Sequence, residues 1–175
     1  QKDLEELQAI QKNQTREQAR IANYWADGPG SYTPPGHWHR IAANEALTAK
    51  YSEIKMARVL AYIGTALMDA GIGCWETKYF YYSPRPQQYD LKTSVGLPNF
   101  PSYTSGHSTF SFAGATVMNY FFPEKADLFN NYAQDASDSR VYGLIHFRLD
   151  CSMGREHGKA IGGYSVVKAK LDGAN

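Results

Sequence analysis

Apolar residues recur every three to four positions along most of this chain, and that spacing limits its fold more than any other feature. The longest such stretch runs from Ser52 toward Lys78, with apolar positions at Met56, Val59, Leu60, Ile63, Leu67 and Ala70. Because an α-helix has about 3.6 residues per turn, this period puts the apolar side chains on one face. A convincing alternation of apolar and polar residues, the pattern of a strand, does not occur in the sequence. The sequence therefore predicts an all-α fold.

Further helices are expected from the same spacing and from start signals. They cover residues 2–12, 16–25, 37–50, 105–121 and 124–147, the last with a bend near Gly143, and a tail follows from Arg155. Thr15 and Gln18 resemble a capping box at the start of the second helix. In the tail, Gly158 and Gly162 lie four residues apart, a spacing that suits close contact with another helix.

Prolines and glycines separate these helices. Residues 27–36 contain three prolines and three glycines, which predicts a loop of about ten residues. Pro84 and Pro86 end the long helix, and a polar connection with further prolines covers residues 87–104. The expected architecture is a helical bundle with long loops around the polar residues described below.

Size and charge narrow the class of protein. The 175 residues fit one domain, residues 1–175, with a core that needs no metal or disulfide. Lysine and arginine total 18 against 17 aspartates and glutamates, so the chain has no overall bias toward nucleic acid. The longest apolar stretch, Val59 to Met68, is about half of the roughly 20 residues that a transmembrane helix requires. We expect a soluble protein without a transmembrane segment, and a homo-oligomer is compatible with these properties.

The first residue and the cysteines leave two questions open. The chain starts at Gln1 with a pattern that is already helical, which favours a processed product or the C-terminal part of a longer parent chain. Cys74 and Cys151 could form a disulfide or remain as two buried thiols, and their spacing does not decide between these alternatives.

Three short blocks carry the residues that could perform chemistry. In order, they are Lys78-x6-Arg85-Pro86, Ser105-Gly106-His107 and Ser139-Arg140-x5-His146-x3-Asp150. The three cations can neutralise a tetrahedral oxyanion, while the serine hydroxyl and the amide of the glycine can donate hydrogen bonds to it. The two histidines can divide the roles of nucleophile and acid-base, and the aspartate can orient the second of them.

Each block alone also has an ordinary structural interpretation. The first could be a solvated basic pair at a helix end, the second a serine that caps a helix, and the third a His–Asp pair within a helix. The functional interpretation gains weight because all three blocks occur in one chain and each supplies a different part of an oxyanion site. We therefore predict that the blocks meet in one pocket.

The blocks resemble the signature of the type 2 phosphatidic acid phosphatase and vanadium haloperoxidase superfamily, and depart from it only at Thr104, where proline is commonest. The resemblance implies a helical bundle in which Lys78, Arg85, Ser105, Gly106 and Arg140 bind phosphate or vanadate. It implies His107 as general acid and base. It also implies His146 as the residue that forms a phosphohistidine or ligates vanadium, with Asp150 orienting it.

Flanking residues are similar to the soluble, haloperoxidase-like branch, whose members are longer and contain two related bundles. This similarity implies that Asp27 contacts Arg140 and that Trp75 and Phe100 lie beside the oxyanion. His37, His39 and His157 are interpreted as structural or surface residues, because the first two straddle Trp38 and point to different faces. A bacterial periplasmic or secreted location is favoured.

The resemblance is compatible with two activities. Five-coordinate vanadate is similar to the transition state of phosphoryl transfer, so a pocket that binds one also accepts the other. Phosphomonoester hydrolysis is favoured first, because it needs no cofactor and because Tyr79, Tyr81, Tyr82 and Ser83 could form a polar wall for a hydroxylic substrate. The expected partner is then a small phosphorylated substrate or phosphate, with no metal. The alternative is a haloperoxidase that uses vanadate as cofactor, which Trp75, Phe100 and Asp27 favour. A third hypothesis is a non-catalytic phosphate-binding module.

Overall fold

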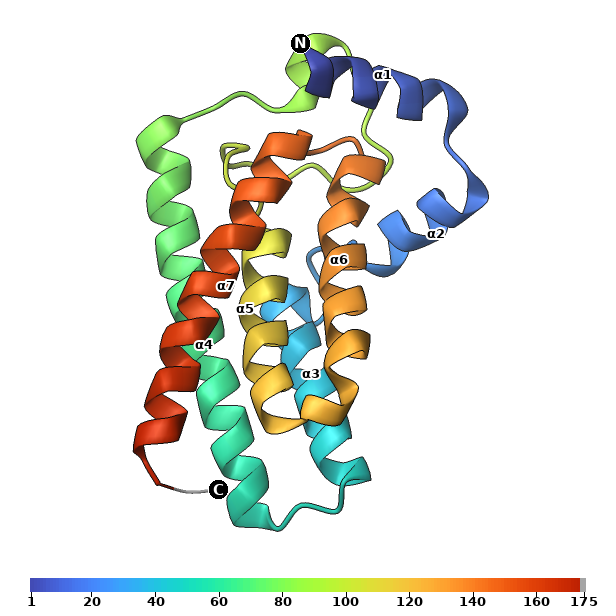
Figure 1. The fold of residues 1–175 in the computed structure, drawn as a ribbon. Helices are drawn as coiled ribbons and strands as arrows, with labels where there is room; N and C mark the ends of the chain where they lie inside the picture. The colour runs from blue at the N-terminus through green and yellow to red at the C-terminus, as the bar shows by residue number, and fades with distance from the viewer. Residues whose placement is uncertain (174–175) are drawn as a thin grey trace.

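The computed structural model describes residues 1–173, and over this range the chain forms helices without a strand (Figure 1). The helices are α1 (Lys2–Asn13), α2 (Arg16–Tyr24), α3 (Thr33–Thr48), α4 (Glu53–Tyr81), α5 (Gly106–Phe121), α6 (Ala126–Tyr142) and α7 (Arg148–Leu171), with short 3-10 helices at Pro86–Tyr89 and Pro123–Lys125. The predicted all-α helical bundle is confirmed.

Helix α5 is the centre of the bundle and contacts α3, α4, α6 and α7 (Figure 1). Most of its residues are buried, which fits a helix that is apolar on nearly all sides. The fully buried side chains of the core include Met118 on α5 and Trp38, Ile63 and Phe129 on other helices. Burial of apolar side chains such as these is the main source of stability for a helical bundle.

Three glycines of α7 allow close approach to α5. A Cβ atom at Gly158 would lie 2.3 Å from the carbonyl oxygen of Thr109, and one at Gly162 would lie 2.7 Å from that of Ala113. At Gly154 the added atom would lie 2.8 Å from the carbonyl oxygen of Ser105. The close helix contact expected from Gly158 and Gly162 is therefore confirmed, and it continues to the first turn of α5.

Three helix boundaries differ clearly from the prediction, and one of them is the end of α6, which lies at Tyr142 instead of residue 147. Helix α3 begins at Thr33 instead of residue 37, because Pro34 and Pro35 lie in its first turn, where the missing N–H groups are not needed. Helix α7 begins at Arg148 instead of Arg155, and residues 143–147 separate it from α6. The side chain of Asp150 accepts a hydrogen bond from the Phe147 amide at 3.1 Å and so satisfies one free donor of the new helix.

The polar blocks gather at one end of the bundle. The last turn of α4 and the first turns of α5 and α7 lie there, together with the long connection from residue 82 to 105, and α1 lies across this end (Figure 1). Cys74 and Cys151 are both free and buried, which answers the question that their spacing left open. Within residues 1–173, no helix combines the length and the apolar character that crossing a membrane requires.

Candidate active site

Lys78 is fully buried in the last turn of α4, and its ammonium group is surrounded by backbone carbonyls. Its Nζ atom donates to the carbonyl oxygens of Pro101 at 2.9 Å, Ser102 at 2.8 Å and Thr104 at 2.5 Å. Burial lowers the pKa of Lys78 to about 8, and the charge of Arg85 adds to this effect. All three ammonium hydrogens are therefore occupied by the loop that precedes α5.

Arg85 lies beside the same loop and reaches His146. Its Nε donates to the Phe100 carbonyl at 2.8 Å, and its Nη1 donates to the Ile145 carbonyl at 2.7 Å. The Nη1 atom is also 3.4 Å from Nε2 of His146. Burial lowers the pKa of Arg85 to about 10, which leaves the guanidinium charged at neutral pH. The first and third blocks thus meet at this contact.

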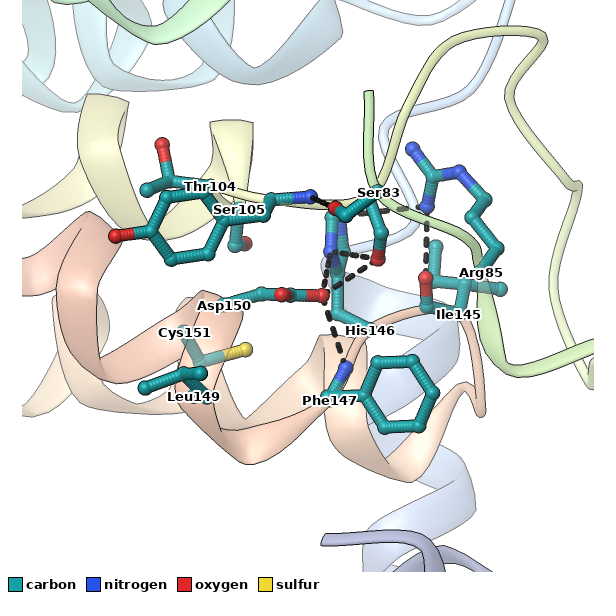
Figure 2. Close-up of polar contacts among 12 residues, drawn as sticks. Ser83, Arg85, Thr104, Ser105, Ile145, His146, Phe147, Leu149, Asp150 and Cys151 are labelled. Carbon is teal, nitrogen blue, oxygen red and sulfur yellow. Dashed lines mark hydrogen bonds and ion pairs between the residues drawn. The ribbon is translucent and has the colours of Figure 1, made fainter. Parts of the chain in front are cut away.

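His146 lies between Asp150 and Arg85 (Figure 2). Its Nδ1 atom is 3.1 Å from Oδ2 of Asp150, which also accepts a 2.5 Å hydrogen bond from the Ser102 hydroxyl. Burial, together with the charges of the three cations of the blocks, lowers the pKa of His146 well below its usual value. A neutral imidazole that donates from Nδ1 to a carboxylate keeps a lone pair on Nε2, which faces Arg85.

Two features of this pair were not visible in the sequence. His146 precedes α7 while Asp150 lies in its first turn, so the two residues do not share a helix face, as the four-residue spacing had suggested. Ser102 was also missed, although it lies three residues before the second block. Its hydroxyl donates to Asp150 and lies 3.3 Å from Nδ1 of His146, so it helps to hold the carboxylate in place.

The second block forms the start of α5. Ser105 is the N-cap and accepts a hydrogen bond from the Ser108 amide at 3.3 Å. Gly106 and His107 are the first two residues of the helix, so their amides have no partner within it and point to the site with the positive end of the helix dipole. A Cβ atom at Gly106 would lie 3.4 Å from the Trp75 ring.

Arg140 and His107 form the other side of the site. Arg140 donates from Nη1 to the Trp25 carbonyl at 3.0 Å, while its buried Nε has no hydrogen-bond partner among the described residues. The buried Nε2 of His107 likewise has none within residues 1–173. Burial lowers the pKa of Arg140 to about 10. Burial also lowers the pKa of His107 well below its usual value, and the charge of Arg140 adds to this effect. Unpaired buried polar atoms of this kind are available to a ligand.

Among the described residues, the expected contact of Asp27 with Arg140 is an electrostatic interaction, in which the carboxylate partly offsets the lowering of the Arg140 pKa by burial, and not a direct ion pair. The carboxylate of Asp27 instead accepts from Nδ1 of His37 at 3.1 and 3.2 Å, and its Oδ2 lies 4.0 Å from Nε2 of His107. The reason is that Nη1 of Arg140 is directed to the Trp25 carbonyl, and the Trp25 ring stacks on His37 at 4.4 Å. His37 was interpreted as structural or surface, yet it is buried and anchors an acid next to His107.

The aromatic residues divide into two groups. Trp75 and Phe100 lie against each other with ring centroids 5.0 Å apart, and Nζ of Lys78 is 5.9 and 5.2 Å from the two centroids. These two rings therefore form a wall beside Lys78. Tyr79, Tyr81 and Tyr82 are instead exposed on the outside of the bundle end, so they do not form a polar wall around the buried cations.

The remaining histidines lie apart from the site. His39 is close to Gly64 and His157 is close to Gly73, both on α4. Burial lowers the pKa of each of these two histidines. Both contacts are with the middle of α4, away from its last turn.

The fold and the arrangement of the blocks define a class of helical-bundle proteins with a buried cationic site at the helix ends. A model of the PAP2 superfamily matches residues 57–169, more than half of the chain, and the protein belongs to this superfamily. A comparison with curated protein sequences finds no match.

Three solved structures are similar to this one. The first bacterial vanadium-dependent iodoperoxidase is 28% identical over 95% of this chain and 48% of its own, with a TM-score of 0.87. LpxE from Aquifex aeolicus is 22% identical over 93% of both chains, with a TM-score of 0.68. A holo-type bacterial vanadium-dependent chloroperoxidase is 14% identical over 94% of this chain and 46% of its own, with a TM-score of 0.76. The chain spans about half the length of the two haloperoxidase chains.

Proposed function

We propose that this protein is a phosphomonoesterase that works through a phosphohistidine at His146. The observation that carries the proposal is the state of that residue. Its imidazole is buried and neutral, Asp150 and Ser102 hold its Nδ1 side, and its Nε2 faces Arg85. A nucleophile for phosphorus needs a lone pair that is aimed at a site where cations stabilise the phosphoryl oxygens.

In this mechanism the phosphoryl group lies among Lys78, Arg85 and Arg140, with hydrogen bonds from the Ser105 hydroxyl and the Gly106 amide. Nε2 of the histidine nucleophile attacks phosphorus, the bond from phosphorus to the ester oxygen breaks, and His107 gives its proton to the departing oxygen. Water then attacks the phosphohistidine, the phosphorus–nitrogen bond breaks, and His107 takes the proton from the water.

The protonation of His107 depends on the substrate. Its pKa is lowered because it is buried near Arg140 and His146, so the empty site keeps it neutral at pH 7. An anionic ester next to it offsets the positive charge of Arg140 and raises the pKa of His107. We therefore expect His107 to take up its proton together with the substrate, with Asp27 adding a negative charge 4.0 Å away.

A second function, vanadate-dependent oxidation of a halide, is favoured by two observations. Trp75 and Phe100 line the cations, and the iodoperoxidase has the highest TM-score of the three similar structures. The residues fit vanadate, because Nε of Arg140 and Nε2 of His107 have no hydrogen-bond partner within residues 1–173 and Nε2 of His146 has a lone pair for a metal. Bound vanadate would supply activation of hydrogen peroxide, while Lys78 would donate a hydrogen bond and His107 would hold a proton.

Two assays on one protein sample separate these functions. The phosphomonoesterase proposal expects turnover of p-nitrophenyl phosphate in the presence of a metal chelator, with inhibition by vanadate. Iodide or chloride oxidation that requires both vanadate and hydrogen peroxide, without phosphate ester turnover, would replace it by the second function. Phosphate binding without either activity would leave the non-catalytic phosphate-binding module.

The lowered pKa of Lys78 predicts how anion binding depends on pH. Sulfate keeps its charge at neutral and alkaline pH, so its affinity reports the charge of the protein. We expect the affinity to fall by about tenfold as pH rises from 7 to 9.5, because the ammonium with a pKa of about 8 loses its proton and one charged hydrogen bond.

Titration calorimetry with sodium sulfate measures this effect at constant ionic strength. Lys78→Met is the matched variant, since it keeps the length of the side chain and removes the titrating group. It should bind sulfate more weakly at pH 7 and show a much smaller change toward pH 9.5. The same pH dependence in the variant and the wild type would show that another group is responsible.

A further inference from the structure

A chain of three buried serine hydroxyls leads from the oxyanion site to a charged residue that lies outside it. Oγ of Ser108 is 3.0 Å from Oγ of Ser105 and 2.9 Å from Oγ of Ser137 on α6. All three serines are fully buried. At the far end, Nε of Arg155 on α7 donates to Oγ of Ser137 at 2.9 Å. The chain thus links α5, α6 and α7.

The direction of the hydrogen bonds in this chain follows from the bond that Ser108 donates to Ser105, and the guanidinium at the other end favours the same direction, because its positive charge repels the Ser137 hydrogen. A guanidinium is only a donor, so Ser137 accepts from Arg155. A hydroxyl has one hydrogen, and that of Ser108 goes to Ser105. The hydrogen between Ser108 and Ser137 must therefore come from Ser137. Every hydroxyl in the chain donates in the same direction, away from the guanidinium.

This direction determines what Ser105 can do. Its oxygen accepts from the Ser108 hydroxyl and also from the Ser108 amide at 3.3 Å. Both lone pairs of the Ser105 oxygen are then used, so its own hydrogen is left to donate elsewhere. A serine without this constraint could turn a lone pair toward an anion, which would repel it.

We propose that Arg155 is a positioning residue that makes Ser105 a hydrogen-bond donor to the bound oxyanion. The inference rests on the proposed function, because it needs an anion beside Ser105. Arg155 is itself held by Asp138 at 3.0 Å and Gln134 at 3.1 Å, so its Nε keeps its orientation toward Ser137. Arg155 influences the orientation of the Ser105 hydroxyl through the serine chain, because hydrogen bonds in series polarise one another.

A double-mutant cycle with inorganic phosphate as ligand tests this role. Arg155→Met removes the fixed donor, and Ser137→Ala removes the middle of the chain without a change of charge. We expect each to weaken phosphate binding by about threefold to tenfold in calorimetry, the range for one neutral hydrogen bond. In a Ser105→Ala background, the same two substitutions should change the affinity by less than about twofold, since the hydroxyl they orient is gone.

Arg148→Met is the matched control. Arg148 also pairs with Asp138 and lies on α7, but among the described residues the hydrogen bonds of its side chain go to Glu6 and Asp138 and not to the serine chain. It should therefore lower stability as much as Arg155→Met does and leave phosphate affinity unchanged.

Three results would overturn the inference. One is that Arg155→Met and Ser137→Ala both bind phosphate with wild-type affinity while Ser105→Ala binds it weakly. This result would leave the proposed function intact. Another is full additivity of the effects in the double variants, which would mean that Arg155 acts through general structure. The third is a wild-type protein that neither binds phosphate nor hydrolyses its esters, which removes the proposed function as well. If Arg155→Met does not fold, Ser137→Ala decides between the first two.

Discussion

Replacement of His146 by alanine is expected to reduce hydrolysis of p-nitrophenyl phosphate by at least about a thousandfold, because it removes the Nε2 lone pair that attacks phosphorus in the proposed mechanism. The fold should persist, since Asp150 keeps its hydrogen bonds from Ser102 and from the Phe147 amide. Steady-state rates give the loss of activity. Acid quenching of the wild type during turnover should also trap acid-labile phosphate on the protein, and the variant should carry none.

His157→Ala is the control for this experiment. His157 lies further along α7 and is close to Gly73, away from the bundle end that holds the cations. It should hydrolyse the ester at the wild-type rate. A His146 variant with the same rate as this control would show that the protein forms no phosphohistidine at this position.

The second large effect concerns stability. Gly158→Ala should lower the free energy of unfolding by about 2–3 kcal/mol, because the new methyl group would lie 2.3 Å from the Thr109 carbonyl oxygen and 3.0 Å from the Ala113 amide nitrogen. Both neighbours are backbone atoms of α5, so they can move only if the whole helix moves. Urea unfolding followed by circular dichroism measures the change.

Gly163→Ala is the opposite case on the same helix. Within residues 1–173, no atom beyond its own turn of helix lies within 4 Å of the added methyl group, so the higher helix propensity of alanine should raise stability by about 0.5–1 kcal/mol. The two variants share residue type, helix and substitution, and differ only in what the methyl group meets. Equal stabilities would mean that α5 and α7 adjust to each other without cost.

The fold was largely predictable because it depends on local patterns. The capping box at Thr15 and the long helix after Ser52 are present as expected, since each depends on residues within a few positions of one another. The start of α7 was placed late, because residues 143–147 contain no proline that would mark a break. Leu144 adopts a positive φ of 58° there, a conformation that leucine rarely adopts and that the sequence therefore does not predict.

The site was predictable in its residues and less so in its contacts. The three blocks contain the charged side chains that lie at one end of the bundle. Charged groups are rarely buried without a function or a partner, so a set of them with complementary chemistry indicates a site. The partners themselves are backbone carbonyls for Lys78 and a residue ten positions away for Asp27. Carbonyls are common to every residue, so no sequence pattern identifies which of them a cation will contact. The link from Asp27 to His37 depends on how the loop before α3 turns.

The carbonyls around Lys78 have a consequence for turnover. An anion that takes one of the ammonium hydrogens displaces the oxygen of Pro101, Ser102 or Thr104, which is an acceptor already in place. The anion therefore competes with the protein's own backbone as well as with water, and part of its attraction is offset. In the proposed phosphatase reaction, the same carbonyls can recapture the ammonium once hydrolysis ends and so help to expel inorganic phosphate. A site with three buried cations can in this way avoid lasting inhibition by its own product.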